Sequence, residues 1–144
     1  MMSLWEHIVA LKDAYYSFTS AVYKKYDLKP REFDILMYLY TYPNEATATD
    51  IVRKENLSKS HVSVSLRSLE EKGLVRGEYQ GQNHRTIYLR LTEASEKIVS
   101  EGIEARAIFA RTMLDGFSDD EIKSFFESLA KVKKNILTHA KNHR

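Results

Sequence analysis

The stretch that decides the fold is LSKSHVSVSLRSLEEKGLVRGEYQGQNHRTIYLRLT, residues 57–92. In its first half, apolar residues recur at the spacing of one helix face: Val62, Leu66 and Leu69. Ser58 is a suitable N-cap for this helix, and Gly73 is a suitable residue to end it. The opposite face is rich in serine, so the sequence predicts an amphipathic helix with one buried side and one polar side.

The second half predicts a hairpin of two short strands, 74–79 and 86–91. Apolar and polar residues alternate from Ile87 to Leu91, which is the period of a half-buried strand. Residues 80–85 are polar and include a glycine, so we expect a loop of roughly six residues between the strands. A helix followed by such a hairpin is typical of a winged lobe.

Two helices are predicted before this stretch. Pro30 fits the first position of a helix over residues 31–40, and that helix has one apolar side formed by Phe33, Leu36, Met37 and Tyr40. Thr47, with Asp50 three residues later, has the form of a capping box and opens a short helix to about Lys54. This helix, a turn at residues 56–57 and the serine-rich helix together form a helix-turn-helix arrangement.

Long helices are expected on both sides of the lobe. Residues 3–26 carry an apolar stripe wide enough to touch two surfaces, and from this segment alone the second surface could be a partner subunit or the chain's own core. Thr92 is expected to cap a helix to about Leu114, and Ser118 one that runs to about Thr138. The predicted fold is therefore mainly α with a small β-hairpin.

Composition and charge narrow the possible functions. The chain has 144 residues, a length that suits one domain, and it contains no cysteine, which excludes disulfides and thiol chemistry. Net charge is +2 overall, but residues 53–90 carry eight basic and four acidic side chains, a local balance of +4. A basic middle between mildly acidic flanks is expected if that region faces phosphates. The start of the chain lacks the features of a secretory signal and no apolar run could span a bilayer, so we expect a cytoplasmic location without membrane attachment.

No pattern in the chain favours an enzyme. A glycine-rich phosphate loop and a serine nucleophile motif are both missing from the sequence. The five histidines are scattered, and the pair His139 and His143 lies near the C-terminus, where adventitious binding is the better explanation. We therefore expect neither catalysis, nor a cofactor, nor a specific metal site.

Three segments in this order resemble the MarR family of bacterial transcription regulators. They are LKPREFDIL at residues 28–36, LEEKGLV at 69–75, and Arg85 followed by IYLRLT at 87–92. The resemblance covers nearly the whole of residues 1–144. It implies a winged helix-turn-helix DNA-binding lobe at 28–92 and dimerisation helices at 3–26 and 93–140, which interleave with those of a second copy.

The resemblance also implies the residues that contact DNA. Side chains on the exposed face of the serine-rich helix would meet base edges in the major groove: Ser60, His61, Ser63, Val64 and Arg67. Ser58 and Lys59 are assigned to phosphates, and Arg85 to the minor groove beside Asn83 and His84 at the tip of the hairpin. The family commonly has an aspartate where this chain has Asn83, which can accept a hydrogen bond from a guanidinium but supplies no charge.

The function that follows is a sequence-specific homodimeric repressor that binds an inverted repeat and is released by a small, often aromatic, ligand. Aromatic and apolar residues of the helices that could line a ligand pocket are Tyr15, Phe18, Phe33, Met37, Tyr38 and Phe109. An aromatic stripe at helical spacing is more often core than pocket, so both interpretations stand. The alternative function is a winged-helix module that binds a protein partner and no DNA.

Overall fold

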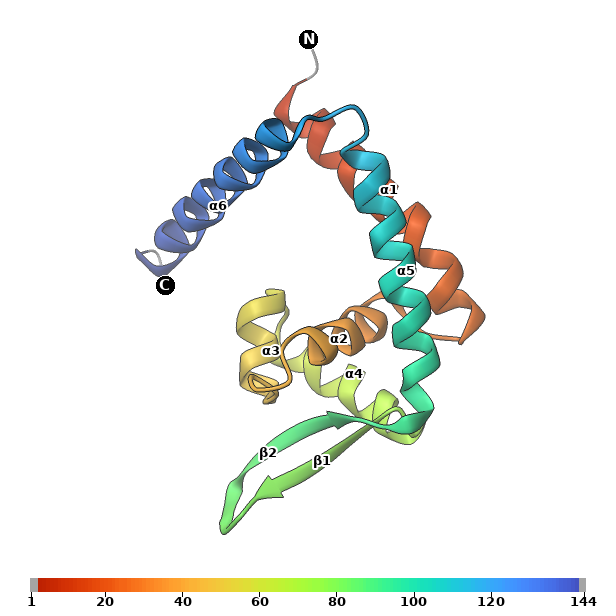
Figure 1. Cartoon of the computed structure of the whole chain (residues 1–144). Coiled ribbons are helices and arrows are strands. Elements are labelled where there is room, and N and C mark those ends of the chain that lie inside the picture. Colours follow the sequence, from red (N-terminus) through yellow and green to blue (C-terminus); the bar gives the residue numbers. More distant parts are fainter. Residues whose placement is uncertain (1–2, 143–144) are drawn as a thin grey trace. The chain divides into compact units, whose positions relative to one another are not determined.

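The computed structural model describes residues 3–142 and is mainly helical with one two-stranded hairpin, which confirms the predicted fold class (Figure 1). In chain order the elements are α1 (Leu4–Lys25), α2 (Pro30–Thr41), α3 (Ala48–Glu55), α4 (Lys59–Glu71), β1 (Val75–Gln80), β2 (Asn83–Leu91), a 3-10 turn (Glu93–Ser95), α5 (Glu96–Met113) and α6 (Asp119–Asn142). The chain forms two compact units, one ending at Phe109 and the other beginning at Ala110.

The core of the first unit is built around α2. Phe33, Ile35 and Leu36 of this helix have no exposed surface, and α3 and α4 add Ile51 and Leu69, which are equally buried. One residue of the predicted apolar side is wrong: Tyr40 is 54% exposed. Neighbouring elements cover α2 on most of its circumference. Buried residues therefore lie on more than the one face that the helical period predicts.

Local sequence signals set the boundaries of the helix-turn-helix. The Thr47 hydroxyl accepts a hydrogen bond from the Asp50 N–H at 3.1 Å, and the Asp50 carboxylate accepts one from the Thr47 N–H at 3.3 Å, as the capping box requires. Asn56 takes the left-handed conformation, with φ of 52°, and ends α3. Ser58 then caps α4 by accepting from the His61 N–H at 3.1 Å. The predicted short helix, turn and longer helix are thus present.

The hairpin differs from the prediction at its tip. β1 and β2 pair antiparallel from Val75 opposite Leu91 to Gln80 opposite Asn83, with a shift of register between Glu78 and Gln80. Only two residues, 81 and 82, remain as the turn, so the expected six-residue loop was wrong. Gly81 has φ of 56°, the left-handed region that the first central residue of a tight hairpin turn can require. The polar residues after it, which suggested a loop, are strand residues exposed to solvent.

The start of the long helix also differs in detail. Thr92 precedes the 3-10 turn, not α5 directly, and its side chain makes no capping bond. Its hydroxyl instead donates to the Gly73 carbonyl at 2.6 Å, where α4 ends. This hydrogen bond ties the end of the hairpin to the end of the serine-rich helix.

The first half of α5 packs closely against α2. An added Cβ at Gly102 would lie 2.7 Å from the Met37 sulfur and 2.8 Å from a ring carbon of Phe33. A side chain at this position would therefore push the two helices apart. Glycine disfavours a helix interior by roughly 1 kcal/mol relative to alanine, and here it permits the close approach.

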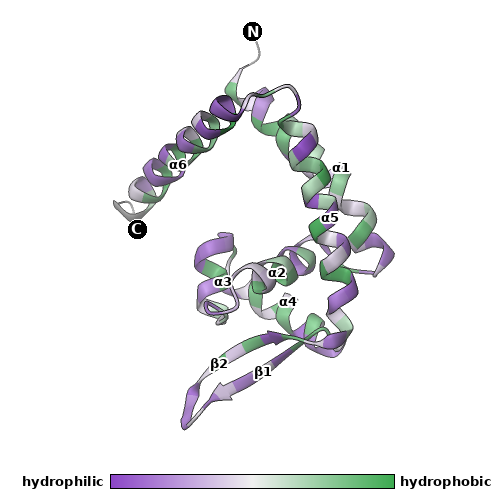
Figure 2. Cartoon of the chain, in the orientation of Figure 1, coloured by the Kyte–Doolittle hydropathy of each residue, from purple (hydrophilic) through white to green (hydrophobic). Residues whose placement is uncertain are grey.

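Hydrophobic residues alternate with hydrophilic ones along α1 and α6 (Figure 2), and several of the apolar side chains on these helices are exposed. On α1 they include Leu4 and Trp5, which are 69% and 73% exposed. On α6 they are Phe126, Leu129, Val132, Ile136 and Leu137, with exposures of 43–61%. Monomeric proteins seldom leave so many large apolar side chains in water. Within residues 3–142, none of the helices has the length and hydrophobicity needed to cross a membrane.

Candidate nucleic-acid interface

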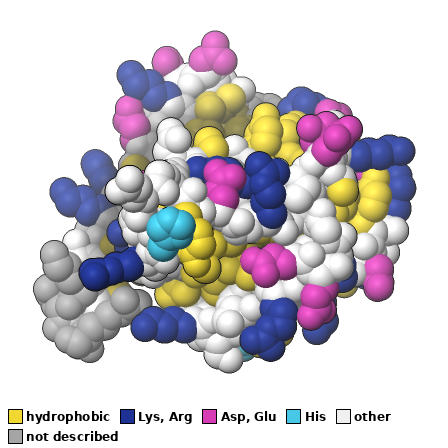
Figure 3. Space-filling view, turned by 90° about the horizontal axis from the view of Figure 1, so that it is seen from below, with side chains coloured by type: hydrophobic (Ala, Val, Ile, Leu, Met, Phe, Trp, Pro, Cys, Tyr) yellow, Lys and Arg dark blue, Asp and Glu magenta, His cyan; other side chains and the backbone are white. Residues whose placement is uncertain are grey.

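The serine-rich helix α4 presents the face that the sequence assigned to DNA. Its inward residues are buried, with Val62 at 1% and Leu69 at 0% exposure. All of the predicted contact residues on its outward face are exposed: Ser58, Lys59, Ser60, His61, Ser63, Val64 and Arg67. Val64, the apolar residue of this face, is 58% exposed. Seen from below, the molecule shows an apolar surface with Lys and Arg side chains, and also Asp and Glu side chains, around it (Figure 3).

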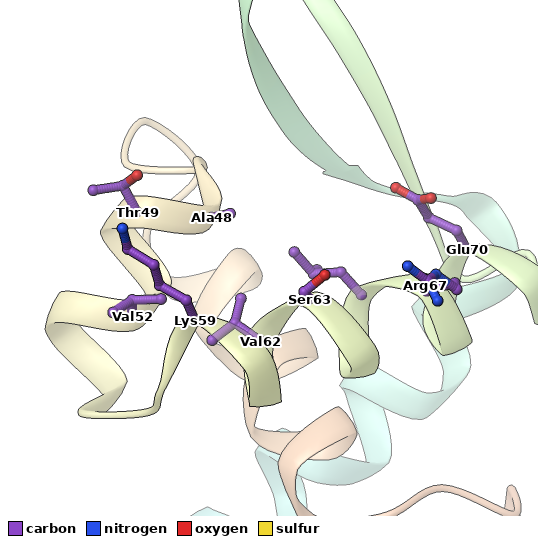
Figure 4. A pocket seen from close by; sticks show the side chains of 9 residues that line it. Ala48, Thr49, Val52, Lys59, Val62, Ser63, Arg67 and Glu70 are labelled. Carbon is purple, nitrogen blue, oxygen red and sulfur yellow. The ribbon is translucent and has the colours of Figure 1, made fainter.

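A groove of about 520 Å³ lies between α3 and α4. Lys59 and Thr49 lie at one end, and Arg67 and Glu70 lie at the other (Figure 4). Its apolar lining comes from Ala48, Val52, Val62 and Leu66. The groove therefore runs along α4 with a positively charged side chain toward each end.

Ion pairing separates the basic residues of the lobe into two groups. Five of the eight cations between residues 53 and 90 have a carboxylate partner within 4 Å, and these are Arg53 with Asp50, Lys54 with Glu45, Lys72 with Glu32, and Arg76 and Arg90 with Glu78. Over the part of the chain that the structure describes, the other three, Lys59, Arg67 and Arg85, have no such partner. Because these three cations have no carboxylate partner, their charge is available to an outside anion. They are also the three cations that the sequence predicted to contact DNA.

The orientation of α4 depends on a buried carboxylate that the sequence did not single out. Glu32 of α2 is 1% exposed and accepts hydrogen bonds from the Ser68 hydroxyl at 2.7 Å and from the Lys72 ammonium at 3.2 Å. It also accepts from the Lys29 N–H at 2.9 Å. Burial acts to raise the pKa of Glu32, but these hydrogen bonds outweigh it and hold the pKa below the ordinary value of 4.5. The Ser68 hydroxyl is committed to this contact with Glu32.

Replacing Glu32 with glutamine is expected to lower the free energy of unfolding at neutral pH by about 1–3 kcal/mol, since Gln cannot match the charge-assisted bonds. A group with a lowered folded-state pKa stabilises the protein above its unfolded pKa, and that stability is lost as the pH falls through the folded value. The difference between the wild type and Glu32→Gln should therefore shrink below pH 4.5. Urea unfolding at neutral and acidic pH measures it, with exposed Glu71→Gln as the control. A difference that is constant with pH would contradict the role of the charge.

The tip of the hairpin is organised by Asn83. Its side-chain oxygen accepts a hydrogen bond from the Arg85 backbone N–H at 3.1 Å, so it braces the main chain and leaves the guanidinium without an intramolecular partner among residues 3–142. His84 packs its ring against Tyr79 of the opposite strand, with 4.8 Å between ring centroids. The Arg85 side chain is thus exposed at the end of a locally ordered strand.

The residues of the predicted ligand pocket fall into two groups. Phe33, Met37 and Tyr38 are core residues, at most 2% exposed. The other three are half-buried and pack together: the Phe109 ring lies 5.7 Å from the rings of both Tyr15 and Phe18. A ligand at this place would therefore contact the second group first.

A polar cluster beside these rings joins α1, α2 and α5. The Tyr15 hydroxyl donates to Asp34 at 3.0 Å, and the Arg106 guanidinium donates to the Tyr15 oxygen at 2.7 Å and to Asp34 at 3.3 Å. Burial, and next the charge of Asp34, raise the pKa of Tyr15 to about 12. Burial also raises the pKa of Asp34 and of the nearby Glu55 above their usual ranges. Residues so distant in sequence give no pattern that could predict the cluster.

The comparisons with known proteins agree with this architecture. Residues 26–85 match the MarR family. The chain is 27% identical over 120 residues to the HTH-type transcriptional regulator PecS of Dickeya dadantii, which covers 82% of this chain and 72% of that protein. It is 26% identical over 103 residues to the uncharacterized HTH-type transcriptional regulator YdgJ of Bacillus subtilis, which covers 72% of this chain but only 62% of that protein's length.

Solved structures show the same fold. A MarR family transcriptional regulator from Listeria monocytogenes, crystallised with a 26mer DNA, superposes with a TM-score of 0.83 at 22% identity and covers 94% of this chain and 90% of its own. At that identity the likeness concerns the fold alone. The family match at residues 26–85, the two related regulators and the shared winged fold together support membership of this chain in the MarR family.

Proposed function

We propose that this protein is a homodimeric, sequence-specific DNA-binding repressor that recognises an inverted repeat and is released by a small ligand. The observation that carries the proposal is that, within residues 3–142, Lys59, Arg67 and Arg85 have no carboxylate within 4 Å, whereas each of the other five cations between residues 53 and 90 has one. The Listeria monocytogenes regulator with a similar fold was crystallised with duplex DNA, which supports the same class of partner.

In this proposal α4 enters the major groove. The Arg67 guanidinium has two parallel N–H donors that match the O6 and N7 acceptors of guanine, and the exposed methyl groups of Val64 suit contact with a thymine methyl. Ser60, His61 and Ser63 can donate or accept hydrogen bonds at neighbouring base edges. Sequence preference would therefore come from the first three turns of α4.

Phosphates would be held at the start of the same helix. The Ser58 oxygen already accepts the His61 N–H, but its own hydroxyl hydrogen remains available for a phosphate oxygen. Lys59 lies next to it, at the end of the groove between α3 and α4. These contacts would set the register of the helix without distinguishing sequences.

The hairpin would place Arg85 in the adjacent minor groove, where a narrow A·T tract concentrates negative potential. Asn83 supports that placement by fixing the Arg85 backbone, and His84, held against Tyr79, would flank it. The uncharged Asn83 leaves the full guanidinium charge for DNA.

Replacing Arg85 with alanine is expected to weaken binding by about 1–3 kcal/mol per half-site, the usual magnitude of one protein–DNA contact. The loss should be larger on duplexes with A·T tracts at the wing positions than on duplexes with G·C pairs there. Fluorescence anisotropy on the two duplexes measures this, and Arg76→Ala, which removes a paired cation of the same hairpin, is the matched control. An equal loss on both duplexes would reduce Arg85 to a phosphate contact.

Ligand control would act where α1 and the part of α5 up to Phe109 meet the lobe. Tyr15, Phe18 and Phe109 offer aromatic surface there, beside the Arg106 and Asp34 pair. A small aromatic compound that displaced one of these rings would disturb the hydrogen bonds between α1, α2 and α5. A drop in DNA affinity on adding such a compound, with tight binding restored on its removal, is the expected behaviour.

A salt titration separates this function from the alternative of a protein-interaction module. When Lys and Arg side chains replace the counterions of DNA, the logarithm of the binding constant falls linearly with the logarithm of the salt concentration. We expect measurable binding to a mixed-sequence duplex at low salt, and a steep decline of the affinity as the salt concentration rises. Absence of binding at low salt would refute the proposal and favour a protein partner.

A further inference from the structure

A second groove, of about 400 Å³, borders α4 on the side of α2. It is lined by Lys29, Pro30, Arg31, His61, Val64 and Ser65. The helix α4 is thus bordered by two grooves, one shared with α3 and one shared with the start of α2. The second groove includes two cations outside the segment in which the sequence showed an excess of positive charge.

Lys29 and Arg31 are exposed, and neither forms an ion pair with a carboxylate of residues 3–142. The nearest acid in sequence, Glu32, is buried and already bound by Ser68 and Lys72. Both ammonium and guanidinium groups are therefore available to an outside anion. They resemble Lys59 and Arg67 in this respect.

The start of α2 offers little through its own backbone. Pro30 has no N–H, and the Lys29 N–H is taken by the Glu32 carboxylate at 2.9 Å. That carboxylate also places negative charge at the helix end, which disfavours an anion held by the backbone alone. The two long side chains are the positively charged groups at this helix end that can recognise an anion.

We propose that this groove receives the second phosphodiester strand of the DNA duplex, with Lys29 and Arg31 as its phosphate contacts. The inference rests on the proposed function, since it takes α4 to lie in the major groove. That groove is about 12 Å wide and a helix with its side chains is about 10–12 Å across, so both strands bordering the groove come close to the flanks of the helix. One strand lies along the α3 side, near Lys59, and the other lies along the α2 side.

The contact is independent of base sequence. With phosphate contacts on both of its sides, α4 cannot shift sideways in the major groove. Arg67 and Val64 therefore contact the bases from a fixed position. Each neutralised phosphate releases condensed counterions, and the slope of log affinity against log salt changes by about 0.9 per phosphate.

The test compares the wild type with Lys29→Ala, Arg31→Ala and the double variant on a mixed-sequence duplex, by fluorescence anisotropy from low to moderate salt. Each single variant is expected to reduce the salt slope by about 0.9 per lobe, with the same loss of affinity on unrelated sequences. Lys12→Ala, which removes an exposed cation from α1, is the control for net charge and should leave the slope unchanged. Circular dichroism verifies that each variant is folded.

The two hypotheses fail in different ways. No binding by the wild type refutes the proposed function itself. Normal wild-type binding with an unchanged slope in Lys29→Ala and Arg31→Ala overturns only the contact proposed here. A duplex with a single methylphosphonate gives a sharper result: neutralising the contacted phosphate should abolish the effect of Arg31→Ala, and an effect that persists at every neutralised position would overturn the assignment.

Discussion

Replacing Arg67 with alanine is expected to remove the preference for one base pair in each half-site and to weaken binding to the best site by about 1–3 kcal/mol per contact. Two half-sites double the loss for a symmetric dimer, so affinity would fall by roughly 30-fold to about 10⁴-fold, at about 1.4 kcal/mol per factor of ten. The effect should be large because Arg67 forms no ion pair with a carboxylate of residues 3–142, so its charge is not already engaged in the free protein.

The measurement is a comparison of duplexes that differ at one base pair, using a site selected from a random pool. In the variant, the wild-type preference at one position should disappear while preferences at other positions remain. Arg67→Lys should keep part of the affinity but little of the discrimination, since an ammonium cannot form the bidentate contact. Arg53→Ala is the matched control, because it removes an exposed cation that is paired with Asp50. An equal loss on every duplex would show that Arg67 binds phosphate.

Replacing Val132 with aspartate is expected to abolish the dimer and, with it, high-affinity binding to an inverted repeat. Val132 is 51% exposed and lies near Leu129 and Ile136 on one face of α6, as an interface residue would in the free subunit. A carboxylate buried there without a partner costs several kcal/mol. A monomer holds one half-site only, so its affinity should fall by about 10³-fold or more, toward the non-specific level.

Sedimentation or light scattering gives the oligomeric state, and anisotropy on the selected site gives the affinity. Lys131→Asp puts the same side chain on the polar side of α6 and should leave both measurements unchanged. A soluble monomer of Val132→Asp that binds the complete inverted repeat as tightly as the wild type would contradict the proposed role of this face.

The sequence predicted the parts of the lobe that depend on local rules. The division of α4 into a buried and an exposed side follows from the helical period alone, and the positions of Val62, Leu69 and Arg67 agree with it. The starts of α3 and α4 follow from Thr47 and Ser58, whose side chains satisfy N–H groups of their own helix. Such signals act over four residues or fewer, so one sequence is enough to recognise them.

What the sequence could not predict depends on the tertiary structure. Tyr40 is exposed because no neighbouring element within residues 3–142 covers that part of α2. The turn has only two residues because the polar residues beside it are solvent-exposed strand residues, which a pattern of alternating apolar residues cannot reveal. Ion pairing is the clearest case. Lys72 and Arg67 look alike in the sequence, but Lys72 pairs with Glu32, 40 residues away, and Arg67 pairs with no carboxylate in the described part of the chain. The contrast that supports the interface appears only after folding.

The two carboxylates near the start of α2 serve different neighbours. Glu32 is bonded to α4 through Ser68 and Lys72, and Asp34, two residues later and so on the other side of the helix, is bonded to α1 and α5 through Tyr15 and Arg106. A displacement of α1 or α5 that keeps the Asp34 bonds moves α2, and a displacement of α2 that keeps the Glu32 bonds moves α4. If α4 reads DNA as proposed, α2 would act as a rigid link that couples movements of α1 and α5 to α4.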